Sequence, residues 1–176
     1  MNVTMIGPTI ALYKPQIPPN TGNISRLCVA LNSFLYIIGK PNFQWDEASL
    51  KRAGLDHWKH LQFKWAPRYR DFIQDVGERR IVAVTKSADT TLFDFEFQKE
   101  DILLFGNEQM GLPPSLLKTI ESRVRIPMFS ENVRSLNLSN AAAVAAYEYI
   151  KQIETEETKV GLNYKRTYYN SDDKGK

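Results

Sequence analysis

The sequence of 176 residues predicts one α/β domain, built on a mainly parallel sheet that is flanked by helices. Short apolar runs rich in β-branched and aromatic residues alternate with segments of helical periodicity, and this alternation is typical of α/β layered domains. Two of the runs, Ile81–Val84 and Ile102–Phe105, are apolar on both faces. Strands of a parallel sheet that is covered by helices have that composition.

The predicted strands are short apolar runs bounded by turn residues or by a helical pattern. In chain order they are Thr9–Tyr13, Phe34–Gly39, Gln62–Trp65, Arg80–Thr85, Ile102–Phe105 and Arg123–Pro127. The predicted helices show apolar residues at helical spacing and, in two cases, a glycine directly after the end. In chain order they are Thr21–Leu31, Glu47–Ala53 before Gly54, Tyr69–Val76 before Gly77, Pro114–Ile120, and a long helix from about Ser139 to Glu154.

Composition limits the class of protein. Hydrophobic residues make up 43% and charged residues 24%, as in ordinary soluble globular proteins. No run approaches the roughly 18 consecutive apolar residues of a membrane helix, and the first seven residues lack a signal-peptide pattern. We therefore expect a cytoplasmic protein with a single domain over residues 1–155. Residues 156–176 are expected to form a polar tail that ends in disorder.

Cys28 is the single cysteine, which excludes an intramolecular disulfide and a cysteine-based zinc site. It shares the apolar face of a predicted helix with Ile24, Leu27 and Leu31, so we expect a buried and unreactive thiol. The sequence suggests no metal.

The net charge is only +3, but residues 51–70 concentrate basic and aromatic side chains. Against the single acid Asp56, this segment holds six basic residues: Lys51, Arg52, Lys59, Lys64, Arg68 and Arg70. Basic groups neutralise phosphates and aromatic faces stack on unpaired bases, which suits RNA. A solvated face whose aromatic residues turn into the core explains the composition equally well.

A glycine loop follows one buried strand. The segment from Gly106 to Gly111 lies between this strand and a helix that opens at Pro113-Pro114, which is the layout of a phosphate cradle. Leu112-Pro113 stand where a P-loop needs Lys and Ser or Thr, so a P-loop nucleotidase is excluded. No two glycines are two residues apart, which excludes the dinucleotide fingerprint. Because Glu108 adds a negative charge, a cofactor without phosphates fits better; a simple tight turn is the alternative.

Two more segments crowd polar residues at predicted helix starts. Ser135, Asn137, Ser139 and Asn140 precede an alanine-rich helix; one of them suffices as a cap, so the others suggest a polar pocket. The alanine-rich surface allows close packing against the sheet or a second subunit. Asn20, Thr21, Gly22 and Asn23 open the helix that carries Arg26. An arginine there faces the unfavourable end of the helix dipole, as is typical of a functional residue, although a surface salt bridge would also explain it.

Together these segments closely resemble the SpoU-type members of the SPOUT RNA methyltransferases, and the likeness runs from about Ala11 to Ile150. The motifs are Pro-Asn-Thr-Gly-Asn-x-x-Arg, Phe-Gly-x-Glu-x-x-Gly-Leu-Pro, and Ile-Pro-Met followed by Ser-Leu-Asn-Leu-Ser-Asn. The resemblance implies a C-terminal deep trefoil knot, a homodimer with active sites at the interface, and S-adenosylmethionine as cofactor. The implied cofactor-binding residues are Val84, Thr85, Gly106, Ile126, Met128, Ser135 and Leu136.

The resemblance also implies catalytic and RNA-binding residues. Arg26 matches the catalytic arginine of the family, and Asn20 is expected to orient the ribose or Arg26 itself. Tyr147 matches a tyrosine near the substrate entrance, and Lys51 and Arg52 belong to the expected surface for the anticodon arm of tRNA.

The likeness is strongest to the small enzymes that methylate the ribose 2′-oxygen of the tRNA wobble nucleotide, a cytidine or a modified uridine. The same reaction at another tRNA or ribosomal RNA nucleotide, and a knotted RNA-binding protein without catalysis, are the alternatives. Two departures from the family leave the choice of substrate open. Met110 stands where relatives often carry a basic or polar residue, and the tail after Thr155 is longer than in the minimal relatives.

Overall fold

The computed structural model describes residues 7–40 and 56–153. They contain a six-stranded sheet with the order β3-β2-β1-β5-β4-β6, in which all neighbouring strands are parallel. The strands are β1 (Thr9–Tyr13), β2 (Phe34–Ile38), β3 (Gln62–Ala66), β4 (Ile81–Val84), β5 (Ile102–Phe105) and β6 (Ser122–Val124). The predicted α/β class with a parallel sheet is confirmed.

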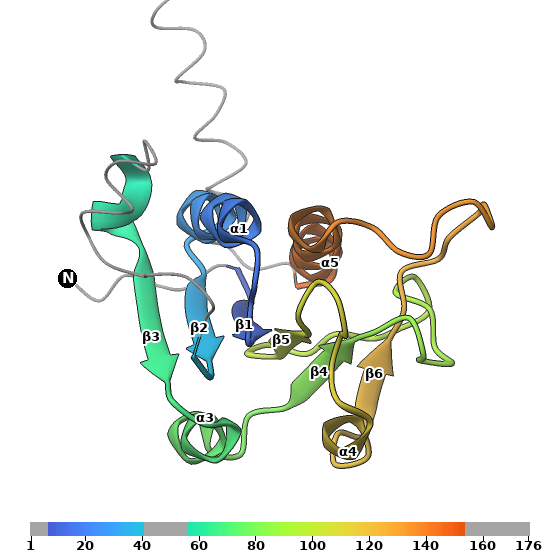
Figure 1. The fold of residues 1–176 in the computed structure, drawn as a ribbon, viewed down its shortest axis with the longest axis horizontal. Helices are drawn as coiled ribbons and strands as arrows, with labels where there is room; N and C mark the ends of the chain where they lie inside the picture. Colours follow the sequence, from blue (N-terminus) through green and yellow to red (C-terminus); the bar gives the residue numbers. More distant parts are fainter. Residues whose placement is uncertain (1–6, 41–55, 154–176) are drawn as a thin grey trace, which may run out of the picture.

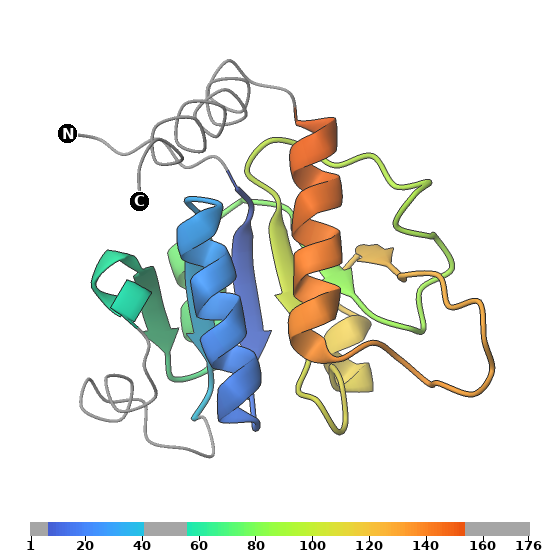
Figure 2. The same cartoon turned by 90° about the horizontal axis from the view of Figure 1, so that it is seen from above.

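Helices cover both faces of this sheet, as Figures 1 and 2 show. The helical elements are α1 (Pro18–Ala30), η1 (Asp56–His60, a 3-10 helix), α3 (Tyr69–Val76), α4 (Pro114–Leu117) and α5 (Leu138–Gln152). Helices α1 and α5 pack together on one face, and α3 and α4 lie on the other. Successive side chains of a strand point to opposite faces, so Leu103 and Phe105 join the core under α1 and α5. Ile102 and Leu104 join the core on the α3 side.

The boundaries differ from the predicted ones for local reasons. Helix α1 begins at Pro18 and not at Thr21, because Pro18 and Pro19 occupy its first two positions, where a missing N–H leaves no hydrogen bond unmade. Strand β6 is shorter than predicted, since the backbone of Arg125 bonds to Thr90 and Leu92.

Further boundaries and segments depart from the prediction. Helix α4 ends at Leu117, before the predicted Ile120. The predicted helix Glu47–Ala53 lies outside the described residues. Element η1 was not predicted, because its sequence lacks a periodic apolar pattern.

The structure bears on two expectations from composition: the burial of Cys28 and the lack of a membrane-spanning helix. Cys28 is fully buried, which confirms the predicted burial, and burial raises the pKa of its thiol to about 12, which favours the unreactive thiol form. None of the helices in the described ranges has the length and apolar character needed to cross a membrane.

Candidate active site

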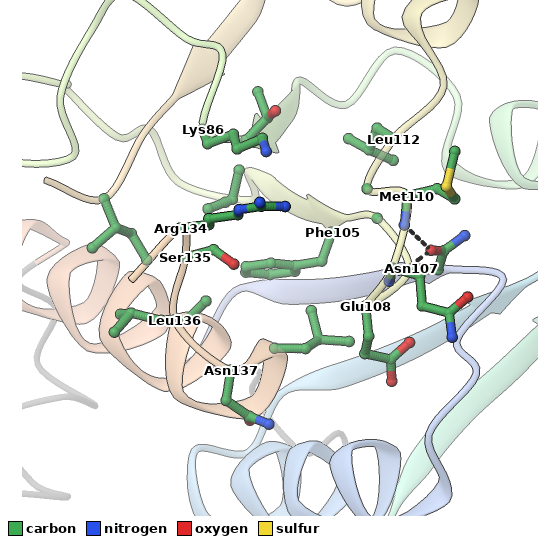
Figure 3. Close-up of a pocket in the computed structure, with 18 of the residues that line it drawn as sticks. Lys86, Phe105, Asn107, Glu108, Met110, Leu112, Arg134, Ser135, Leu136 and Asn137 are labelled. Atoms are coloured by element: carbon green, nitrogen blue, oxygen red, sulfur yellow. Dashed lines mark hydrogen bonds between the residues drawn. The ribbon is translucent and has the colours of Figure 1, made fainter. Parts of the chain in front are cut away.

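A cavity of about 720 Å³ lies at the carboxyl ends of β4, β5 and β6. Ligands of open α/β sheets bind at this edge, because the loops that leave the strands converge there. The loops after these three strands and the start of α5 form its walls (Figure 3). All the residues predicted to bind the cofactor line this cavity: Val84, Thr85, Gly106, Ile126, Met128, Ser135 and Leu136.

The loop after β5 is held together by its own asparagine. The Oδ1 atom of Asn107 accepts hydrogen bonds from the backbone N–H groups of Gln109 (3.1 Å) and Met110 (2.7 Å). The N–H group of Gly111 donates to the carbonyl oxygen of Asn107 over 2.9 Å. The segment is therefore the tight turn that glycine and asparagine predict, and it is also a wall of the cavity.

Gly106 permits a close approach of backbone within this loop. A Cβ atom at this position would lie 2.1 Å from the carbonyl carbon of Gly111 and 2.2 Å from the nitrogen of Leu112. Neither contact is possible between real atoms, and both partners are backbone atoms that cannot rotate away. Only glycine allows the two ends of the turn to lie side by side at the cavity.

Glu108 connects the loop to the start of α1. Its carboxylate accepts hydrogen bonds from the backbone N–H groups of Gln16 (2.9 Å) and Ile17 (3.0 Å), and from Nδ2 of Asn20 (3.1 Å). Helix α1 has no cap from its own side chains, since Ile17 occupies the N-cap position. A carboxylate at a helix N-terminus also interacts favourably with the helix dipole. Glu108 thus fixes, from about 90 residues away, the course of the chain as it enters α1.

Asn20 joins all three segments that the sequence brings to attention. While its Nδ2 atom donates to Glu108, its Oδ1 atom accepts a hydrogen bond from Nδ2 of Asn137 over 2.9 Å. Asn137 is the N-cap of α5, and its Oδ1 atom accepts from the N–H group of Ser139 over 2.9 Å. Through these hydrogen bonds, the buried side chain of Asn20 connects the starts of α1 and α5 with the loop after β5. The polar cluster before α5 is therefore both a cap and a link between loops.

The predicted catalytic arginine lies apart from this cavity. Arg26 is exposed on α1 and is not among the residues that line the cavity, whereas Asn20 is. Tyr147 is exposed on α5, at 54% of its surface. Lys51 and Arg52 lie outside the described residues. A single chain thus brings together the predicted cofactor positions and Asn20, but not Arg26 or Tyr147.

The basic and aromatic segment is less positive than its sequence suggests. Two of its cations form ion pairs with acids of α3: Lys64 with Asp75, and Arg68 with Asp71 over 2.7 Å. The hydrogen bond from Lys64, followed by that from a tyrosine of β2, holds the pKa of the Asp75 carboxyl below its usual value. Exposed aromatic surface is nevertheless present, since Trp65 is 52% accessible. The composition alone could not reveal these pairs, because the acids lie after the counted segment.

His57 attaches this segment to α1. Its Nε2 atom lies 2.8 Å from the hydroxyl oxygen of Ser25, which itself donates to the carbonyl oxygen of Gly22 over 2.7 Å. Because the hydroxyl proton is used in that bond, the proton shared with Ser25 must come from Nε2 of His57. Ser25 directly precedes Arg26, so η1 is held on the helix that carries the predicted catalytic arginine.

Sequence reasoning missed several residues that line the cavity. The charged ones are Lys86 and Arg134, and the apolar ones include Phe105, Leu112 and Leu138. Lys86 directly follows the predicted Val84 and Thr85, and Arg134 directly precedes Ser135, so adjacency in sequence was the available signal. Within the described residues, no group of three or more His, Cys, Asp or Glu side chains is placed to hold a metal ion.

The chain resembles known proteins along most of its length. The model of the SpoU rRNA Methylase family matches residues 7–147. The tRNA (cytidine(34)-2'-O)-methyltransferase of Aeromonas hydrophila is 42% identical over 146 residues, which cover 82% of this chain and 93% of that protein.

Two solved structures share the fold. One, described as giving structural insights into the 2-OH methylation of C/U34 on tRNA, is 37% identical with a TM-score of 0.78, and the match covers 83% of this chain and 95% of that one. The other is the SpoU methyltransferase AviRb from Streptomyces viridochromogenes in complex with the cofactor AdoMet. It is 26% identical with a TM-score of 0.73, and the match covers 86% of this chain and 62% of that one.

Proposed function

The chain belongs to the SpoU rRNA methylase family, and from this premise we propose that it is a tRNA (cytidine(34)-2'-O)-methyltransferase that uses S-adenosylmethionine. The observation that carries the proposal is the 42% identity to an enzyme of that name across 93% of its length. The wobble nucleotide of tRNA, a cytidine or a modified uridine, is then the substrate. The place of action is the cytoplasm.

The cavity fits the cofactor. Its volume of about 720 Å³ lies within the range of small-molecule sites, which are mostly apolar with a few placed polar groups. Gly106 has no side chain, so a cofactor can lie close to its backbone. The apolar walls at Ile126 and Leu136 suit an adenine ring. Val84, Thr85, Met128 and Ser135 complete the set that would hold it. When bound, S-adenosylmethionine supplies a methyl group that is already activated by the sulfonium charge.

Arg26 is proposed to act through its charge. A guanidinium is effectively never deprotonated in a protein, so Arg26 does not serve as a base. Its exposed position on α1 suits a contact with the phosphate next to the target ribose and stabilisation of negative charge that develops on the 2′-oxygen. Asn20, whose side chain is bonded to Glu108 and Asn137, is proposed to position Arg26 by fixing the start of α1.

A homodimer explains why Arg26 lies outside the lining of the cavity. We infer that a second subunit packs on the exposed side of α5, where Val144 and Tyr147 are 39% and 54% accessible. Three alanines of that helix, Ala142, Ala145 and Ala146, are fully buried against the sheet, so the proposed interface rests on the exposed side chains and not on the alanines. A dimer would bring the arginine of one subunit toward the cavity of the other. Light scattering should then give twice the chain mass of 20.2 kDa.

Three further parts of the proposal follow from the family resemblance. The C-terminal part of the domain is proposed to thread into a deep trefoil knot, which is consistent with β5 lying between β1 and β4 in the sheet. Lys51 and Arg52 are proposed to contact the anticodon arm. Residues 1–155 are proposed to be one domain, and residues 156–176 a polar tail.

The test is methyl transfer from labelled S-adenosylmethionine to undermodified tRNA, with the modified nucleotide located by mass spectrometry. We expect a 2′-O-methyl group on the first anticodon nucleotide. Arg26→Ala should abolish transfer and keep the cofactor affinity within a few fold. Arg123→Ala is the matched control, because Arg123 is exposed on β6 and does not line the cavity. Transfer to another tRNA or ribosomal RNA nucleotide would support the 2′-O-methylation reaction but assign it a different substrate nucleotide. Binding of the cofactor without any methyl transfer would favour the alternative of an RNA-binding protein without catalysis.

A further inference from the structure

Two positive side chains share one side of the cavity. Lys86 follows β4 and Arg134 lies in the loop before α5, and both are exposed. Figure 3 shows them on the side of the cavity away from Glu108. No ion pair joins either of them to another residue within 7–40 or 56–153. Two like charges beside one cavity, without a counter-ion from these residues, favour a negatively charged ligand.

Glu108 does not supply the missing counter-ion. It is the single acid among the described residues that line the cavity, and its carboxylate is bound by three donors at the start of α1. The remaining walls are largely apolar and include Leu112, Ile126 and Leu138. A negative group that enters such a cavity must find charged partners there, since an unpaired charge in an apolar environment is strongly unfavourable.

We propose that Lys86 and Arg134 bind the carboxylate of the amino-acid part of S-adenosylmethionine. The inference rests on the proposed function. A guanidinium matches a carboxylate with two parallel hydrogen bonds, and a nearby ammonium adds a point charge. An RNA phosphate is the competing occupant. The carboxylate is favoured because both cations line the same cavity as the seven positions assigned to the cofactor.

The experiment compares two ligands that differ only in this carboxylate. Calorimetric titration with S-adenosylmethionine and with decarboxylated S-adenosylmethionine is made on wild type, Arg134→Gln and Lys86→Gln, without RNA and without turnover. Arg123→Gln is the control, because this exposed arginine lies outside the cavity. We expect Arg134→Gln to weaken binding of S-adenosylmethionine by about tenfold, as for loss of a charge-assisted hydrogen bond, and to leave the decarboxylated ligand unchanged. Lys86→Gln should also weaken binding of S-adenosylmethionine and leave binding of the decarboxylated ligand unchanged.

Three results would overturn the inference. An equal loss for both ligands would mean that the substitution changes the loop and not a contact with the carboxylate. Unchanged cofactor binding would overturn it as well, and a separate titration of the same variants with tRNA that showed weaker binding would assign the pair to an RNA phosphate. Failure of the wild-type protein to bind S-adenosylmethionine would refute the proposed function as well, and only that result would do so.

Discussion

Replacing Glu108 with glutamine tests the link between the cavity loop and α1. Glutamine keeps the shape of the side chain but has one acceptor oxygen and an NH2 group in place of the second. If the oxygen faces Ile17 and Asn20, the NH2 group faces the N–H donor of Gln16, and that bond is lost. The substitution also removes the charge that strengthens the two bonds that stay.

The magnitude follows from these contacts. Loss of a bond to a charged acceptor costs about 1.5–3 kcal/mol, and each retained bond weakens by about 1 kcal/mol when it becomes neutral. Glu108 is only partly buried, so water offsets part of the loss. We therefore expect the free energy of unfolding to fall by about 2–3 kcal/mol for Glu108→Gln.

Urea denaturation at pH 7 measures this change, since the unfolding free energy falls linearly with urea concentration. Glu121→Gln is the control, because Glu121 is exposed and accepts no hydrogen bond from another described residue. In combination with Asn20→Ala, the two losses should be less than additive by about 1 kcal/mol, since the residues share a bond. A loss for Glu108→Gln below about 0.5 kcal/mol, as for ordinary surface substitutions, would refute the reasoning.

Three further predictions concern the loop, the α3 side and the core. Gly106→Ala should lower the affinity for S-adenosylmethionine at least about tenfold in calorimetry, because its Cβ atom would lie 2.1 Å from the backbone of Gly111; an unchanged affinity would contradict this role. The bond from Lys64 lowers the pKa of Asp75, so the stability that Asp75 contributes is present above its unfolded-state pKa of about 3.9 and is lost as the pH falls through the folded-state pKa. Asp75→Asn should therefore reduce the loss of stability below about pH 4 in urea titrations, and an unaltered pH dependence would argue against the pair. Cys28, with its pKa raised to about 12, should react with a thiol reagent at pH 8 only after unfolding, and rapid labelling of the folded protein would show that the thiol is accessible.

The sequence predicted those features that depend on neighbouring residues. Strands such as Ile102–Phe105 were identifiable because both faces of a parallel sheet are buried, which gives a continuous apolar run. Helix α3 was predicted with its observed bounds, since apolar periodicity and Gly77 mark its length and end. The cavity positions came from the family resemblance, and all of them line the cavity.

Features that depend on distant residues were not predictable in the same way. Asn20 and Asn137 are 117 positions apart, and no local pattern indicates that their side chains meet. The ion pairs of Lys64 and Arg68 required the position of α3 relative to β3. Element η1 is held by the contact between His57 and Ser25, which depends on tertiary packing and not on its own five residues.

The hydrogen bonds of the loop after β5 give a second physical reason against a bound polyphosphate, different from the one that the sequence suggests. From the sequence, the charge of Glu108 disfavours a bound polyphosphate, yet that charge is directed to the start of α1. A phosphate cradle requires backbone N–H groups that point at the ligand. Here the N–H groups of Gln109, Met110 and Gly111 are already bonded to Asn107, and α4, with four residues, contributes only a small dipole. The loop is therefore closed to phosphate by its own hydrogen bonds, and it offers the cavity a surface of backbone and apolar atoms instead.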